Sequence, residues 1–276
     1  MGKCIFCGEN AGLFKKEHVE CRQKHEEGEK AVWALALKST EQPESLTSAV
    51  QEVEKISASA WLPRDRLKQL LVVAWEKGAE AAFDRGVLTR EEENLLGKYA
   101  HDFHLTQDDL NVHSWQQRVA VAAALRDLDE GKFPDRMHLT GDVPFNLQPK
   151  ERLAWLFHAV CYEPRTRTEY VGGSQGFSVR LAKGLYYRTS AFKGRPVVTS
   201  FMSQVGAGAL GLTDKHIYFH CPQSAFRIAY AKIVAFDPYP DGIGIHQEAV
   251  SAKPKVFVTG DGWSVYHLAA RLAHLA

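Results

Sequence analysis

The sequence lacks any apolar run close to the roughly 20 residues that a membrane-spanning helix needs. Its first residues, Met1 to Phe6, hold no apolar core of the kind that begins a secretory signal. Myristoylation of Gly2 would require a hydroxyl side chain where Phe6 stands. With 45% hydrophobic and 24% charged residues, the composition is that of an ordinary globular protein, so we expect a cytoplasmic location.

Cysteine is scarce and unevenly placed. The chain has five cysteines, an odd number, and three of them fall within the first 21 residues. Cys161 and Cys221 stand alone much further along. This distribution argues against a disulfide framework and favours a metal site near the beginning of the sequence.

Motifs of common enzyme classes are missing as well. There is no Gly-x-Ser-x-Gly elbow, no His-Glu-x-x-His motif and no Walker loop. Residues 206–211 match Gly-x-Gly-x-x-Gly, but a turn and a strand follow where a dinucleotide fold requires a helix, so we interpret them as hairpin glycines. We therefore predict that the protein is not an enzyme and takes no small-molecule substrate.

Two other groups have a structural interpretation that we prefer to a functional one. His158 and Cys161 are three residues apart, a helical spacing that would pair them, but the apolar stretch around Cys161 predicts a buried thiol. His101 and His104 fall at the end of a predicted helix, where an imidazole suits the helix dipole.

The first 21 residues predict a zinc knuckle. Cys4-x-x-Cys7-Gly8 places two thiolates on a tight turn, with a glycine that lets the backbone fold back. Residues 15–29 predict a polar helix that carries His18 and Cys21 three residues apart on one face. We predict that Cys4, Cys7, His18 and Cys21 bind one structural Zn²⁺, which would supply the folding free energy that so short a segment lacks. His25, four residues beyond Cys21, is the competing fourth ligand, and we favour His18.

The chain reads as a multidomain α+β protein of three regions. We predict a zinc knuckle over 1–30, a helical bundle over 31–135 and a β domain over 136–276. Apolar residues recur at helical spacing over 46–60 and 64–83, and Thr89 to Glu92 form a capping box that opens a further helix. After residue 136, short β-branched and aromatic runs alternate with turns, which predicts an antiparallel sandwich or partly open barrel closed by a helix over 262–276.

Two parts of the chain resemble known bacterial families. The hairpin Gly208–Phe219, the strand Ile228–Phe236 and the terminal helix resemble a pleckstrin-homology-like (PH-like) domain. That resemblance implies a β-barrel that binds acidic head groups at its first hairpin loops. The segment Asp84–Glu92 resembles the signature of the tellurite-resistance TerB-like bundle, although Arg85 separates the usual Asp-Gly pair. This order of parts resembles that of bacterial or prophage accessory proteins.

Charge is divided unevenly along the chain. Residues 31–145 hold 13 basic and 19 acidic groups, whereas residues 146–276 hold 15 and 8. Such asymmetry indicates an anionic partner for the last region, or docking of one region on the other. The candidate anion-binding or partner-binding residues are Arg180, Lys183, Arg188, Lys193 and Arg195.

These features together predict a non-enzymatic zinc-binding adaptor. We expect a protein partner, or an anionic one bound through the PH-like domain. The alternative is a nucleic-acid-binding accessory protein, in which the knuckle and the basic face of the barrel would hold phosphates. An anionic lipid surface is a further partner that the basic face would suit.

Overall fold

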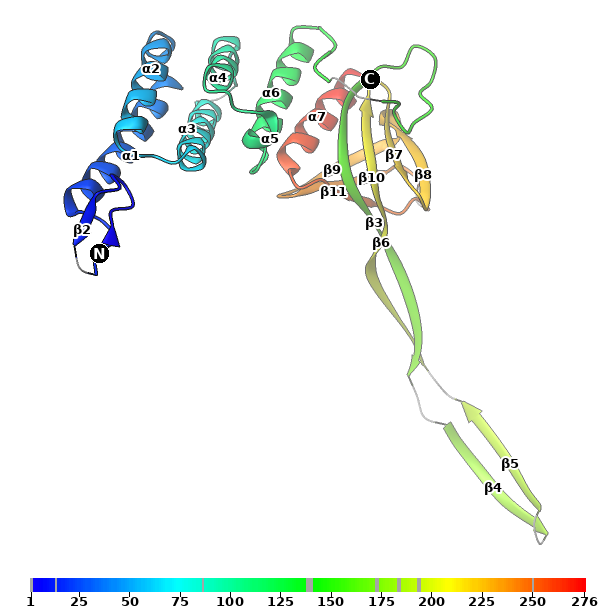
Figure 1. The fold of residues 1–276 in the computed structure, drawn as a ribbon. Helices are drawn as coiled ribbons and strands as arrows, with labels where there is room; N and C mark the ends of the chain where they lie inside the picture. Colours follow the sequence, from blue (N-terminus) through cyan, green and yellow to red (C-terminus); the bar gives the residue numbers. More distant parts are fainter. Residues whose placement is uncertain are drawn as a thin grey trace. The chain divides into compact units, whose positions relative to one another are not determined.

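Figure 1 shows a computed structural model of the chain, in which residues 2–12, 14–85, 87–137, 141–171, 174–182, 185–192, 195–249 and 251–276 are described. Within 168–198 only the backbone is described. The chain divides into two compact units, residues 1–138 and 139–276, and each is considered by itself. The finer division into three regions stays a prediction.

The first unit begins with a small hairpin and continues as helices. Strands β1 (Gly2–Lys3) and β2 (Asn10–Gly12) pair in antiparallel fashion. The helices that follow are α1 (Val19–Ser39), α2 (Pro43–Ser59), α3 (Arg64–Asp84), α4 (Arg90–Asp102), α5 (Gln107–Leu110) and α6 (Trp115–Asp129). The predicted helices are present, but the first begins at Val19 and not at residue 15, and it runs without a break across the predicted boundary at residue 30.

Short-range chemistry explains where several helices begin. Thr89 and Glu92 form a complete capping box at α4, as predicted, because each side chain bonds the other's backbone N–H. Thr106 and Asp109 do the same at α5. The core of this unit includes Trp75, which is 1% exposed and whose indole N–H donates to the Leu96 carbonyl at 3.0 Å. The polar group of this buried side chain is therefore satisfied.

The second unit is a seven-stranded antiparallel sheet with one helix. Its strand order is β8-β7-β6-β3-β11-β10-β9. Helix α7 (Gly262–Leu275) packs its apolar stripe, including Val265, Leu268 and Leu272, against the sheet at β9 and β10. The strands are β3 (Leu153–Val171), β6 (Arg195–Thr213), β7 (His216–Cys221), β8 (Ser224–Ala229), β9 (Ile233–Tyr239), β10 (Gly242–Gln247) and β11 (Lys255–Val258).

Three expectations for this unit need correction. Within the described residues, no ladder joins the edge strands β8 and β9, so the sheet is open and is not a closed barrel. The alternation of short apolar runs with turns predicts separate strands over 197–201 and 209–213, but both segments belong to the single strand β6. His158 and Cys161 lie on β3 and not on a helix, so their odd spacing puts them on opposite faces, with His158 exposed and Cys161 buried.

Strands β3 and β6 extend beyond the sheet as a two-stranded ribbon. β11 pairs with β3 only at Val160–Tyr162, and β7 pairs with β6 only at Ala209–Leu212. From Glu163 to Val171, the ladders of the described residues join β3 to β6 alone, over about 30 Å at 3.3 Å per residue. Figure 1 shows this projection, and β4 (Ser174–Ala182) pairs with β5 (Leu185–Phe192) in the intervening segment.

Glycine in β6 permits close strand packing. A Cβ atom on Gly208 would lie 1.9 Å from the carbonyl oxygen of His220 on β7. Gly206 and Gly211 are similarly crowded, by Cys221 and by Phe145. The Gly-x-Gly-x-x-Gly match is therefore confirmed as a hairpin feature, because β6 leads into a turn and β7 with no helix after it.

A buried carboxylate ties the start of β3 to the turn between β6 and β7. The side chain of Glu151 is fully buried and accepts four hydrogen bonds. Its Oε1 lies 2.5 Å from Thr213 Oγ1 and 2.8 Å from His216 Nδ1. Its Oε2 accepts from the Tyr218 hydroxyl at 2.7 Å and from the Gln148 backbone N–H at 2.9 Å. This network holds the start of β3 against the turn that joins β6 to β7.

Candidate metal centre

The cysteine turn is held by the backbone before any metal is considered. The Cys4 N–H donates to the Glu9 carbonyl at 2.7 Å, and the Gly8 N–H donates to the Cys4 carbonyl at 2.9 Å. Gly8 has a φ of 75°, a left-handed conformation that glycine adopts without strain. The turn therefore aims Cys4 and Cys7 in one direction, as the sequence predicts.

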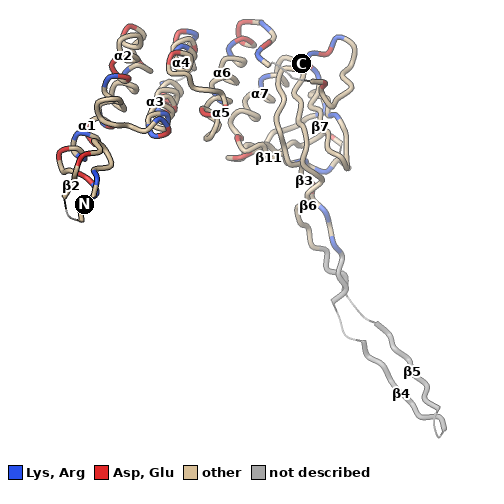
Figure 2. Tube along the Cα trace, in the orientation of Figure 1, with Lys and Arg blue, Asp and Glu red and all other residues tan. Residues whose placement is uncertain are grey.

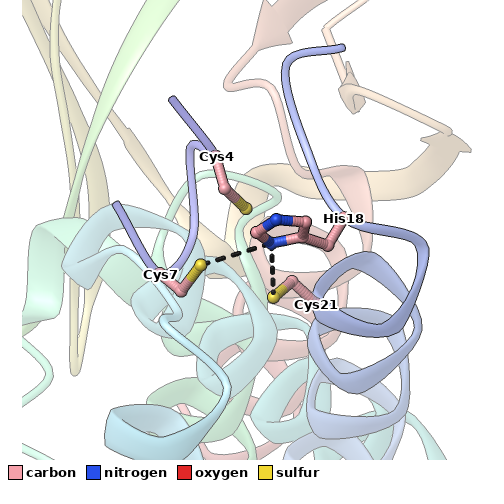
Figure 3. A group of neighbouring side chains, drawn as sticks. All are labelled: Cys4, Cys7, His18 and Cys21. Atoms are coloured by element: carbon pink, nitrogen blue, oxygen red, sulfur yellow. Dashed lines mark hydrogen bonds between the residues drawn. The ribbon is translucent and has the colours of Figure 1, made fainter. Parts of the chain in front are cut away.

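The start of α1 supplies the other two side chains. His18 is the N-cap residue, with extended backbone, and Cys21 stands in the first helical turn. The one ligand atom from each of Cys4, Cys7, His18 and Cys21 lies within 4.8 Å of the other three. Figure 3 shows the four side chains converging.

The distances suit a tetrahedral metal ion. His18 Nδ1 lies 3.4 Å from Cys7 Sγ and 3.6 Å from Cys21 Sγ. Zinc bonds of about 2.3 Å to sulfur and 2.0 Å to nitrogen at tetrahedral angles separate the ligand atoms by about 3.5–3.8 Å. The cluster therefore fits a metal ion of this size with little rearrangement.

His18 is oriented by a second contact. Its Nε2 lies 3.1 Å from the carbonyl oxygen of Asn10, which accepts only if Nε2 carries the hydrogen. Nδ1 is then the unprotonated nitrogen that faces the thiols. The same bond is the chief reason that the pKa of His18 is raised. Nothing in the sequence pattern signals this contact, because the acceptor is a backbone group.

The thiols differ in how readily they ionise. Burial raises the pKa of Cys4, but hydrogen bonds, chiefly from the backbone N–H groups of Cys7 and His18, outweigh it and lower the pKa to about 6. Burial, together with the neighbouring Cys7 and Cys4, raises the pKa of Cys21 to about 11. Three thiolates this close repel one another, so full ionisation of the cluster requires a bound cation.

His25, the competing ligand, has another role. Its Nδ1 lies 2.8 Å from the Ala60 carbonyl oxygen, and its Nε2 lies 3.7 Å from Glu29. Its ring stacks on Phe6, with the centroids 4.7 Å apart. His25 is absent from the ligand cluster, so the structure selects His18. Spacing alone does not separate the two, because the helix predicted over 15–29 would place both on the face of Cys21, whereas the structure has His18 as the N-cap, just before α1.

The side chains of the five predicted anion-binding residues are not among the parts that the structure describes. Lys183 and Lys193 lie outside the described residues, and Arg180, Arg188 and Arg195 are described by backbone alone, on β4, β5 and β6. Two cations that precede them in this unit, Arg165 and Arg167 on β3, are described with their side chains, and both are exposed. Figure 2 shows Lys and Arg positions, in blue, along the described part of the paired strands β3 and β6 where they leave the sheet.

Other chemical candidates do not assemble into sites. In the part of the chain that the structure describes, the Cys3His cluster is the only group of three or more possible metal ligands. Burial raises the pKa of the Cys161 thiol to about 12, which suits an inert core side chain. His101 contacts the neighbouring Asp102 at 3.0 Å on an exposed surface.

Membrane and family comparisons add little. No described helix is long and apolar enough to cross a membrane. Comparison with protein-family models and with curated proteins gave no match. Function is therefore inferred from the chain's own residues.

Proposed function

We propose that the chain is a non-enzymatic zinc-binding interaction protein that holds an anionic partner through the first hairpin of a PH-like domain. The observation that carries this proposal is the projection of β3 and β6 beyond the sheet, in a segment, residues 163–203, whose sequence is basic. Residues 163–203 contain seven Lys and Arg residues against two acidic residues. A long-range attraction for anions follows from that excess.

The metal is proposed to be Zn²⁺ in a structural role. Three cysteines and one histidine are a ligand set typical of structural zinc. The protein fills all four tetrahedral positions, which leaves no open position for a catalytic water. A bound zinc ion would fix the cysteine turn against the start of α1, so the site would shape a surface and not perform a reaction.

Strand order supports the PH-like proposal. Two meanders, β3-β6-β7-β8 and β9-β10-β11, meet where β11 pairs with β3, and one helix follows the last strand. The first hairpin of this sheet is β3–β6, the place where the resemblance implies binding of acidic head groups. The basic segment 163–203 therefore belongs to the hairpin at which the resemblance implies binding of anionic ligands.

Where β3 and β6 leave the sheet, the ribbon has a face that suits an anionic partner. Arg165 and Arg167 are two residues apart on β3, so they share one face of the ribbon. Their cross-strand partners on β6 are Phe201 and Thr199, and Phe201 is 47% exposed. Cations beside an exposed aromatic ring form a surface that suits phosphate-bearing partners.

The knuckle supports a second, proteinaceous contact. Ile5, Phe14 and Val19 are 68%, 98% and 64% exposed, although the segment is very small. Phe14 also has a φ of 65°, a conformation that costs a non-glycine residue about 1 kcal/mol or more. An apolar side chain held outward in this way is typical of a recognition surface. We include a protein partner at the knuckle in the proposal.

Nucleic acid is the second candidate for the anionic partner. The major groove of DNA admits a two-stranded β-ribbon, and the ribbon of β3 and β6 has that form. Binding of this kind would weaken steeply as salt is raised.

One experiment separates these partners. The full chain would be tested against vesicles with and without anionic lipid, and against duplex DNA and RNA at low salt. The variant Arg165→Glu/Arg167→Glu would be compared with Lys232→Glu/Lys253→Glu, which changes the same charge at exposed positions elsewhere in the unit. We expect binding to one anionic class, weakened at least tenfold in the ribbon variant alone. No binding to any of them, or equal loss in both variants, contradicts the proposal.

A further inference from the structure

The helical unit also carries a groove, whose lining residues include none of the four candidate metal ligands. It has a volume of about 470 Å³ and runs between α3 and the segment 108–113, which includes the end of α5. Its residues on α3 recur at positions 65, 68, 69, 72, 73 and 76, which is one continuous stripe of a helix. The groove is therefore an extended surface feature along about three helical turns.

The middle of the groove is aliphatic. Val72 and Val73 line it from α3, and Val112 lines it from the opposite side. Val73 is 44% exposed and Val112 is 70% exposed. Two exposed valines facing one groove give apolar area that a partner can bury, at about 25 cal/mol for each Å².

Two polar contacts hold the walls of the groove together. Lys68 Nζ on α3 lies 2.7 Å from Asp109 Oδ1, and His113 Nδ1 lies 2.9 Å from Glu76 Oε1. Each contact joins α3 to the 108–113 segment. The pKa of Asp109 is lowered to about 2, chiefly by its bond to Lys68. The groove is thus preformed, and its only lysine is already engaged.

The rim is acidic. Four carboxylates and one lysine line the groove, namely Asp65, Glu76, Asp108 and Asp109 against Lys68. Asp65 and Asp108 are exposed, and neither has an ion-pair partner among the described residues. An aliphatic floor between two unpaired carboxylates is complementary to a segment that alternates aliphatic and cationic side chains.

We propose that this groove binds a basic amphipathic segment of a partner protein. Leucine-like side chains of that segment lie on Val72, Val73 and Val112, and its lysines or arginines lie beside Asp65 and Asp108. A helix laid in a groove between helical elements is a common mode of peptide recognition, and basic amphipathic helices are its usual ligands where the rim is acidic. The site is independent of the zinc cluster and of the basic ribbon.

The test uses the full chain and a defined peptide. The probe is a fluorescent 15-residue peptide with leucines on one helical face and lysines on the other, and the control peptide has serine in place of each leucine. We expect saturable binding of the leucine peptide only. Equal binding of the two peptides, or no binding of either, overturns the proposal because the aliphatic floor then contributes nothing.

Protein variants locate the binding. Asp65→Asn/Asp108→Asn removes two rim charges, and Glu44→Gln/Glu52→Gln removes two exposed charges on α2 as the matched control. We expect the rim variant to weaken binding about tenfold and the α2 variant to leave it unchanged. Val112→Ser, at a side chain too exposed to matter for folding, is expected to weaken binding severalfold. Unchanged affinity in both groove variants contradicts the assignment of the site.

Discussion

The ring of Phe6 stacks on the imidazole of His25, with the two centroids 4.7 Å apart. Phe6 stands between Cys4 and Cys7, whereas His25 lies one turn of α1 beyond Cys21. Trp61, which follows α2, adds a third ring 6.2 Å from Phe6. Through the ring of Phe6, the candidate metal centre is therefore packed on α1 and on the residue Trp61 that follows α2.

The two histidines should respond differently to truncation. His18→Ala removes a ligand, so we expect loss of most of the bound zinc. His25→Ala removes a stacking ring and the bond to the Ala60 carbonyl but no ligand, so zinc stays at one per chain while stability falls by about 1–2 kcal/mol. Metal analysis and thermal unfolding of both variants check this. Zinc loss in His25→Ala with retention in His18→Ala would reverse the ligand assignment.

Chelation should release the knuckle and spare the helices. The Ile5 N–H donates to the Lys16 carbonyl, so the segment that carries Lys15 and Lys16 is held by the folded turn. Removing zinc takes away the free energy that folds the turn, and trypsin should then cut after these lysines much faster. Circular dichroism should retain most of its helical signal. Restoration of protection by Zn²⁺ but not by Mg²⁺ is the control, and unchanged cleavage in chelator would count against a metal-folded knuckle.

Glu151 should make stability depend on acid. Burial raises its pKa, but hydrogen bonds from Thr213, Tyr218 and the Gln148 N–H outweigh burial and lower the pKa to about 2. Because the folded value lies below the unfolded value of about 4.3, the stabilisation is complete above about pH 5 and is lost as pH falls toward 2. Glu151→Gln lacks this titration and should be roughly 1–3 kcal/mol less stable at neutral pH.

Unfolding of the wild type and Glu151→Gln at several pH values checks the sign. The gap between the two free energies of unfolding should shrink below about pH 4, where the wild-type carboxylate becomes protonated. A gap that stays constant from pH 7 to pH 3 would mean that the buried network does not select the ionised form.

Two glycine substitutions should have opposite effects. A methyl group on Gly208 would meet the His220 carbonyl oxygen, so Gly208→Ala should force β6 and β7 apart and cost several kcal/mol. Gly97 in α4 has nothing within 4 Å of its built Cβ, so Gly97→Ala should stabilise by about 0.5–1 kcal/mol. Denaturant unfolding measures both. A mild effect at Gly208 would show that the two strands are less tightly packed than described.

Local signals made most of the helices predictable. A capping residue such as Thr89 acts within three positions, so sequence alone places the start of α4. The cysteine cluster was predictable for the same reason, since Cys4 and Cys7 share one turn. The sequence favours His18 over His25 but does not exclude His25, because the contacts that separate the two are with Asn10 and Ala60, which are 8 and 35 residues away.

Non-local pairing accounts for what sequence could not predict. The run from Leu153 to Val171 is apolar at first and suits a buried helix as well as a strand, and only pairing with β6 and β11 decides. The partners of Glu151 are more than 60 residues distant, except for Gln148. The groove likewise brings α3 beside residues about 40 positions later.

The zinc content and ligand set of the full chain, purified without chelator, test the central claim most directly. Metal analysis with X-ray absorption at the zinc edge should give one zinc ion per chain, with three sulfur ligands at about 2.3 Å and one nitrogen ligand at about 2.0 Å. Substoichiometric zinc, or a first coordination sphere containing oxygen in place of a thiolate, would contradict a closed structural site at Cys4, Cys7, His18 and Cys21.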